Sequence, residues 1–307
     1  ITNCVDHNGN VFDGYEIIDD TETLRTMSIT KCNNKFNPIV RVPAEITLVD
    51  DKAYTVISLG GFTDHSGLEL IEMPDTVKTI SARGFFNCYS LAELTLPESL
   101  EAIGRSAFQS CSKLKKVFIP KTVIDIGESA FADMLSLKTI EVDKDNPRYT
   151  VVNNCLIDKT TGMVMQGFAE FTLPQDGSIT SLGQHCFSNT NIVEAVIPKD
   201  ISIVSNNAFS RCVQLKKVVL TSDVQTLDAT CFAWCPNLTD VVLPEGLINI
   251  RTYVFDACGL TDVEIPSTVE NVLERSFGDM ASLKKVTFKK RVVDGEITPP
   301  YIQKHAF

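Results

Sequence analysis

The chain has 307 residues, 44% of them hydrophobic, and a formal net charge of −11 at pH 7. That charge argues against a nucleic acid as partner, because binding a phosphate backbone requires a basic surface. No apolar run approaches the roughly 18 residues that a membrane-spanning helix needs. We therefore expect a folded protein without a transmembrane segment in this chain.

The first 42 residues do not share the pattern of the rest. Apolar and β-branched residues gather at 11–18 and again at 24–29, which predicts two antiparallel strands. We expect residues 1–42 to form a small antiparallel β cap on the first coil of the following domain. Cys4 and Cys32 fall in this cap, and whether they form a disulfide stays open.

From residue 43 to residue 307 one unit recurs, and a phenylalanine marks each copy. The marking residues are Phe62, Phe85, Phe108, Phe131, Phe187, Phe209, Phe232, Phe255, Phe277 and Phe307. Most gaps between them are 22 or 23 residues. Such a period predicts a solenoid, in which each unit buries its apolar side chains only against its neighbours.

Each unit contains two apolar stretches. In the first, Leu94 and Leu96 alternate with polar residues before Pro97, a pattern typical of a short strand that ends at the proline. In the second, the spacing from Ile126 to Phe131 predicts an extended segment that enters a tight helical turn. Because the strands recur at this period, we expect them to stack in parallel as one continuous sheet.

Two stretches break the period. The 56-residue gap from Phe131 to Phe187 holds an irregular repeat at about residues 143–174, where two strands around a turn at 158–162 predict a protruding hairpin. The second break lies between Phe277 and Phe307. There the pair Pro299-Pro300 favours an extended approach to the last turn.

Residues 119–131, Ile-Pro-Lys-Thr-Val-Ile-Asp-Ile-Gly-Glu-Ser-Ala-Phe, resemble the BspA-like leucine-rich repeat. The resemblance extends over about residues 43–307. It implies an α/β repeat fold: a right-handed leucine-rich repeat solenoid of mainly short parallel strands with short helical turns. The family is associated with secreted or surface-anchored proteins of gut and oral bacteria, several of them described as adhesins. Its pattern contains no catalytic residues, so the resemblance implies neither an enzyme nor a cofactor.

The ten cysteines follow the repeat rather than a disulfide pattern. Cys88, Cys111, Cys212, Cys235 and Cys258 stand three residues after the repeat phenylalanine, and Cys186 and Cys231 stand one residue before it. These are positions for small apolar side chains inside a coil, so we expect buried thiols. Disulfides or a metal site remain the alternatives.

The outward face of the predicted sheet is where we expect a ligand to bind. Three valines recur on it in consecutive units, and this alignment predicts an apolar contact patch. The candidate contact residues are Val196, Val219 and Val242, with Phe118 further away and Lys116 and Lys217 in the adjacent column of mixed charge. The alternatives are plain β-propensity for the valines and a solvated surface for the lysines.

These features predict a non-catalytic recognition module, secreted or anchored at the cell surface, that binds a host or bacterial surface protein or glycan. A structural spacer of the cell envelope without a specific ligand is one alternative. An accessory to polysaccharide degradation is another. The sequence begins at Ile1 without a charged or apolar leader, so we expect any targeting segment to lie outside it.

Overall fold

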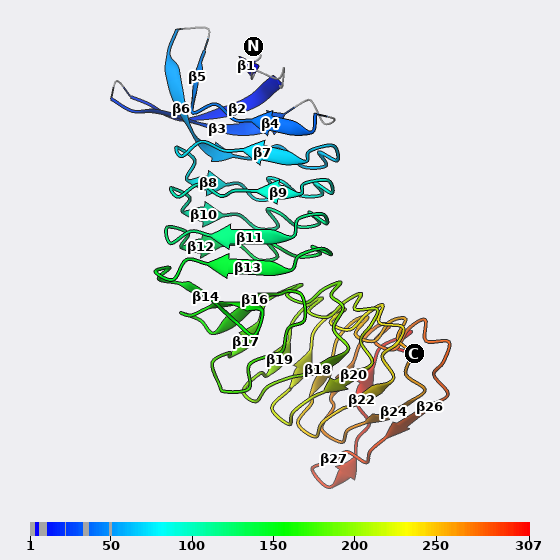
Figure 1. The fold of residues 1–307 in the computed structure, drawn as a ribbon. Coiled ribbons are helices and arrows are strands. Elements are labelled where there is room, and N and C mark those ends of the chain that lie inside the picture. The colour runs from blue at the N-terminus through cyan, green and yellow to red at the C-terminus, as the bar shows by residue number, and fades with distance from the viewer. Residues whose placement is uncertain (1–3, 6–10, 22, 33–36, 49–50) are drawn as a thin grey trace. The chain divides into compact units, whose positions relative to one another are not determined.

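The computed structural model describes residues 4–5, 11–21, 23–32, 37–48 and 51–307 (Figure 1). The chain forms two compact units, each much larger than one repeat: Ile1–Val151, called the first unit below, and Val152–Phe307, called the second unit. In both units short parallel strands are stacked coil upon coil, as the repeat period predicts. The prediction of one continuous sheet is wrong, because the hydrogen-bonded ladder of the first apolar stretch is interrupted and forms several separate sheets. Across the described residues no segment is helical, so the prediction of short helical turns is wrong.

The first unit contains two stacks of strands. The longer stack has the order β1-β2-β3-β6-β8-β10-β12, with β5 paired to β6. Its strands are β1 (Cys4–Val5), β2 (Val11–Asp20), β3 (Arg25–Cys32), β5 (Glu45–Thr47), β6 (Ala53–Leu59), β8 (Thr79–Ile80), β10 (Ala102–Ile103) and β12 (Asp125–Ile126). The other stack holds β4 (Ile39–Arg41), β7 (Leu70–Glu72), β9 (Glu93–Leu94), β11 (Lys116–Ile119) and β13 (Thr139–Val142). Strand β14 (Tyr149–Val152) lies where this unit ends.

The second unit repeats the arrangement. One stack holds β18 (Glu194–Val196), β20 (Lys217–Val219), β22 (Asp240–Val242), β24 (Asp262–Ile265) and β26 (Lys285–Phe288). The other holds β19 (Ile203–Val204), β21 (Thr226–Leu227), β23 (Asn249–Ile250), β25 (Asn271–Val272) and β29 (Tyr301–Ile302). The remaining strands are β15 (Cys155–Asp158), β16 (Met163–Gly167), β17 (Ser181–Leu182), β27 (Val292–Val293) and β28 (Glu296–Ile297).

The antiparallel elements lie where the sequence departs from the repeat. Strands β2 and β3 pair antiparallel, as do β15 and β16 around the turn at 159–162. The division between a cap at 1–42 and a solenoid at 43–307 stays a prediction, as does the right-handed sense of the coil. Cys32 is buried, but the side chain of Cys4 lies outside the described residues, so their pairing remains open.

Phenylalanine rings form a stack through the centre of each unit. In the first unit the centroids of neighbouring rings lie 4.9, 5.3 and 5.9 Å apart, and the rings are those of Phe62, Phe85, Phe108 and Phe131. In the second unit the distances run from 4.5 to 5.7 Å, through Phe171, Phe187, Phe209, Phe232, Phe255, Phe277 and Phe307. The phenylalanines that mark the repeats thus pack inside both units, in two stacks, and of these rings Phe307 at the end of the chain is the exposed one, at 47%. Phe171, which the repeat pattern did not single out, is the first ring of the stack in the second unit.

The turns around each phenylalanine are not helical because two residues per turn have positive φ. Around Phe108 these are Ser106 (φ 54°) and Ser110 (φ 65°), and the left-handed conformation interrupts any α-helix. Along the turn, successive backbone N–H groups alternate between two kinds of acceptor. Ser106, Phe108 and Ser110 donate to carbonyls of the next coil at 2.8–2.9 Å, whereas Ala107 and Gln109 donate to the residue three before them. Neighbouring coils are thus bonded to each other through their turns as well as their strands.

In several coils a glycine directly follows the last aliphatic residue before the turn, as Gly127 follows Ile126, and close approach between coils explains it. A Cβ atom added to Gly127 would lie 2.4 Å from the backbone nitrogen of Arg105 in the preceding coil. No side chain fits there without separating the coils. Glycine at 127 is therefore required by the local coil spacing rather than by a turn, whereas the equivalent position in other coils accepts Ser205, Asp228 or Arg251.

Asn146 anchors the irregular repeat to the coil before it. This side chain, only 2% exposed, donates to the carbonyls of Pro120 and Val123 at 2.8 and 3.0 Å. Its Oδ1 accepts from the amides of Arg148 and Tyr149 at 2.9 and 2.7 Å. One buried amide group thus satisfies four backbone groups that the broken period would otherwise leave without partners.

Candidate functional site

The three valines predicted as a contact patch lie in a row on the second unit. Val196, Val219 and Val242 are register partners in the parallel strands β18, β20 and β22. Their strand neighbours Ala195 and Val218 are 1% and 2% exposed, so alternation along the strand directs the valines outward. Val196 is 40% exposed, Val242 is 74% exposed and Val219 is half-buried. We call these three residues the valine row.

A charged column borders the valine row on the same strands. Glu194, Lys217 and Asp240 are register partners, and the Lys217 Nζ lies 3.1 Å from the Glu194 Oε1. An exposed ion pair of this kind stabilises a fold by only about 0–1 kcal/mol. Because Glu194 compensates the charge of Lys217, the valine row is the more distinctive feature of this face.

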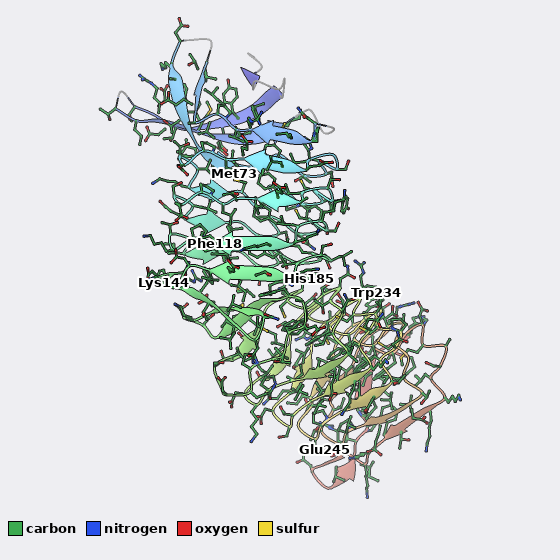
Figure 2. The ribbon with its side chains drawn as sticks, in the orientation of Figure 1. Met73, Phe118, Lys144, His185, Trp234 and Glu245 are labelled. Atoms are coloured by element: carbon green, nitrogen blue, oxygen red, sulfur yellow. The ribbon has the colours of Figure 1, made fainter. Side chains whose placement is uncertain are left out.

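Phe118 and Lys116 belong to the first unit, on strand β11. Phe118 is labelled in Figure 2. Phe118 is 38% exposed and has Glu141 of β13 as its register partner. The Lys116 Nζ lies 2.9 Å from a carboxylate oxygen of the same glutamate. The six candidate residues thus fall into two groups, one in each unit, and the valine row is the larger apolar one.

The cysteines form hydrogen bonds that cross from coil to coil. Each thiol three residues after a repeat phenylalanine donates to the carbonyl of the phenylalanine one coil earlier, at 3.0–3.3 Å. The donors are Cys88, Cys111, Cys212, Cys235 and Cys258. Burial raises the pKa of the Cys88 and Cys258 thiols to about 12. A protonated, buried thiol is a poor nucleophile and a poor metal ligand, so these side chains serve packing.

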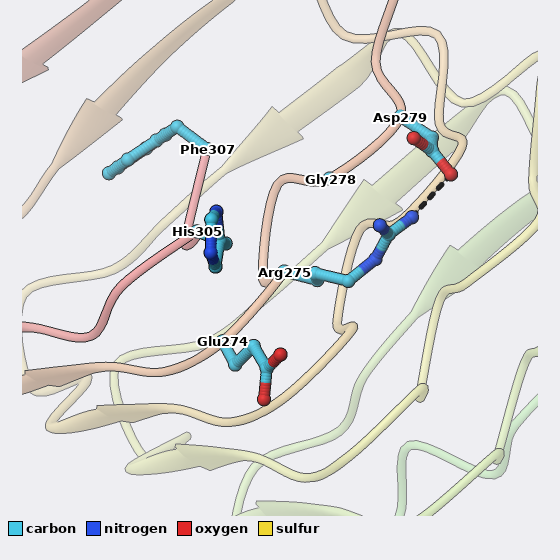
Figure 3. A pocket seen from close by; sticks show the side chains of 6 residues that line it. All are labelled: Glu274, Arg275, Gly278, Asp279, His305 and Phe307. Atoms are coloured by element: carbon cyan, nitrogen blue, oxygen red, sulfur yellow. Dashed lines mark hydrogen bonds and ion pairs between the residues drawn. The ribbon is translucent and has the colours of Figure 1, made fainter.

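Acidic and basic groups surround one hollow in the second unit (Figure 3). Its volume is about 350 Å³, and its lining consists of Glu274, Arg275, Gly278, Asp279, His305 and Phe307. The guanidinium of Arg275 is held by Asp279 and by Asp256, the latter at 3.1 Å. The hollow lining includes no serine, threonine or cysteine nucleophile. Among the residues that the structure describes, no cluster of His, Cys, Asp and Glu is placed to hold a metal ion.

The turn edge of the second unit carries a feature that the repeat pattern did not reveal. The second positive-φ position of successive turns is occupied by Asn189, Arg211, Trp234, Ala257 and Asp279. Trp234, at φ 58°, is the only tryptophan of the chain and is 39% exposed (Figure 2). The guanidinium carbon of Arg211 lies 5.3 Å from the centre of a Trp234 ring. A comparison of this column across the repeats would have singled out the tryptophan.

The sequence pattern of the BspA type leucine rich repeat region matches residues 44–158 and 165–284, in six copies. The chain belongs to this family. Its members are leucine-rich repeat proteins, which are generally non-catalytic. No helix among the described residues is long and apolar enough to cross a membrane.

Several solved structures share the fold of this leucine-rich repeat protein at low sequence identity. A leucine rich cell surface protein from Faecalibacterium prausnitzii is 22% identical, with 93% of this chain and 96% of that one covered and a TM-score of 0.51. The pneumococcal vaccine antigen PcpA is 19% identical, with coverages of 99% and 94% and a TM-score of 0.62. A leucine-rich repeat protein from Eubacterium ventriosum is 18% identical, with coverages of 97% and 91% and a TM-score of 0.61. No curated protein matches the chain.

Proposed function

We propose that this protein is a non-catalytic recognition module, secreted or held at a cell surface, which binds a protein or glycan of a host or neighbouring cell. The binding surface is the outward face of the strand stack in the second unit, centred on the valine row. The observation that carries the proposal is the alignment of three outward valines in consecutive strands. The cell-surface protein and the vaccine antigen among the similar structures support the location.

The composition of the row supports a contact surface because the fold does not require valine there. The same outward position holds Glu141, Glu264 and Thr287 in other coils, and parallel strands pair there as well. Removing apolar surface from water favours association by about 25 cal/mol per Å² before the entropic and desolvation costs of binding are subtracted. The stacked coils hold the row rigid, so little conformational entropy is lost on binding. Lys217 is proposed as a secondary contact beside the row, and Phe118 and Lys116 as a separate contact on the first unit.

Paired substitutions test the valine row. The double variant Val219→Lys and Val242→Lys places two charges in the row, while Thr287→Lys makes the same change at an equivalent outward position beyond it. Binding would be measured by surface plasmon resonance on immobilised mucin, extracellular-matrix proteins and a glycan array. We expect the double variant to lose at least about tenfold in affinity, or about 1.4 kcal/mol, and Thr287→Lys to bind as the unmodified chain does.

Thermal melting of both variants checks that the fold is intact. Full binding by a correctly folded double variant would exclude the valine row as the contact surface. An unmodified chain that binds none of the immobilised probes would instead favour a structural spacer of the cell envelope.

A further inference from the structure

Trp234 stands at a backbone position that disfavours it. Its φ of 58° is in the left-handed region, where asparagine and glycine are tolerated and bulky side chains are uncommon. The same position in other turns holds Asn87 and Asn189 (φ 61° and 60°), residues that suit this conformation. The turn therefore does not need an aromatic ring, and a strained, exposed aromatic side chain points to a use outside the fold.

The Trp234 ring is only partly covered by its neighbours. On the side of the preceding coil, the guanidinium carbon of Arg211 lies over the ring, 5.3 Å from its centre. On the side of the following coil, the same column holds Ala257, whose methyl group is too small to cover an indole. Trp234 is 39% exposed, so part of its surface is open to a ligand.

The ion pair of Arg275 and Asp279 lies two coils from the Trp234 ring, and Asp256 contacts both Trp234 and Arg275. The backbone amide of Trp234 donates to the carbonyl oxygen of Asp256 at 2.8 Å, and the carboxylate of Asp256 holds Arg275 at 3.1 Å. Arg275 also contacts Asp279, the column position that follows Ala257. With about 4.8 Å between neighbouring coils, the ring and the pair stand about 10 Å apart along the stack. The buried carboxylate of Asp256 fixes the guanidinium, and Asp279 is 67% exposed.

We propose that Trp234, together with Arg275 and Asp279, binds a neutral pyranose sugar at the turn edge of the second unit. The C–H face of a pyranose ring carries partial positive charge and stacks on the electron-rich face of an indole. The sugar hydroxyls both donate and accept hydrogen bonds, which matches a guanidinium donor next to a carboxylate acceptor. Arg275 is shared by two carboxylates, those of Asp256 and Asp279, so the site carries no excess positive charge that would attract an anionic ligand. This inference rests on the proposed function, because it names a glycan as ligand, but it uses a different surface.

The only tryptophan of the chain reports on this site directly. Titration with methyl glycosides of glucose, galactose, mannose and N-acetylglucosamine, and with their trisaccharides, should change the fluorescence of Trp234 with a Kd of about 0.1–10 mM for at least one sugar. Saturation-transfer NMR on the same sugars gives a second measurement that does not depend on the indole.

The variant Trp234→Asn removes the ring but suits the backbone conformation, so it should melt at the same temperature or higher. It should lose at least about tenfold in sugar affinity by NMR, and Asp279→Asn should lose several-fold. Tyr89→Ala, which removes another exposed aromatic side chain from the first unit, is the matched control and should bind unchanged. The valine-row double variant should also keep sugar binding, so failure of the row and failure of this site can be told apart.

Three results would overturn the inference. They are a Trp234→Asn protein that binds sugars as tightly as the unmodified chain, no response to any neutral sugar up to about 50 mM, and a response restricted to sialic acid or uronic acid glycosides.

Discussion

Replacing Phe209 by alanine should remove much of the stability of the second unit. The ring is fully buried and lies 4.9 Å from the ring of Phe187 and 5.4 Å from that of Phe232. Phe→Ala at a buried site costs about 3–5 kcal/mol, through lost transfer free energy and the cavity that remains. Two stacking contacts, each contributing about 0.5–1.5 kcal/mol, put this site near the upper end of the range. That amount is a large fraction of the roughly 5–15 kcal/mol that keeps a domain folded.

Urea unfolding followed by Trp234 fluorescence measures the loss, because this tryptophan lies one coil from Phe209 in the same unit. With an m-value of about 2 kcal/mol per M, a loss of 4 kcal/mol moves the midpoint down by about 2 M. Phe118→Ala is the matched control. The Phe118 ring is 38% exposed, and its removal should cost about 1 kcal/mol or less, followed by circular dichroism. A midpoint shift below about 0.5 M for Phe209→Ala at an unchanged m-value would refute the argument that ring stacking holds the coils together.

Four further outcomes follow from the packing of the turns and the irregular repeat. Thiol titration of the native protein should find the repeat cysteines unreactive, and denaturation should release them; thiols that stay blocked in urea would mean disulfides. Because burial raises the pKa of Cys258 to about 12 in the folded state, the unfolded chain releases this proton first, near pH 9. Stability should therefore fall above pH 9 by up to about 1.4 kcal/mol per pH unit for this thiol, and Cys258→Ala should flatten that slope in urea titrations at pH 9–11. Thr230→Asn, at a φ of 57°, should stabilise the fold by about 1 kcal/mol, whereas Thr252→Asn, outside the positive-φ positions, should not. Asn146→Ala should cost about 2–4 kcal/mol, since it leaves buried backbone groups of two coils without partners; an unchanged melting temperature would contradict that account.

The interior of the solenoid could be predicted from the sequence because each inward position recurs in the same environment. Phe108 and Phe209 share the same flanking small residue and the same cysteine three positions later, and both rings are fully buried in a stack. Phe171 escaped the prediction because it lies 16 residues before Phe187, without that flanking pattern. It nevertheless stacks on Phe187 at 4.5 Å, so the irregular repeat begins the stack of the second unit with a different local sequence.

The turns could not be predicted with the same success. Apolar residues three apart, followed by a polar trio, are compatible with one turn of helix, and the sequence alone does not distinguish that from a chain that alternates between conformations. The difference depends on hydrogen bonds to the next coil. Ser106 and Phe108 each donate across the gap between coils, and these bonds compensate for the left-handed conformation at Ser106. A preference that arises from the neighbouring coil is not visible in the local sequence.

The residues at outward positions could be interpreted least well from the sequence. The fold therefore could be predicted in more detail than the binding surface. The stack accepts Val219, Thr287 or Glu141 at the same outward position, so coil packing does not select the residue there. What distinguishes a contact surface is the register that aligns one residue with others from separate repeats. Arg211 and Trp234 are 23 positions apart in the sequence and become a stacked pair only when consecutive turns lie one above the other. A ligand that contacts several coils therefore recognises the register of the solenoid. The contact surface is best located by substitutions that remove one outward side chain and leave the register intact.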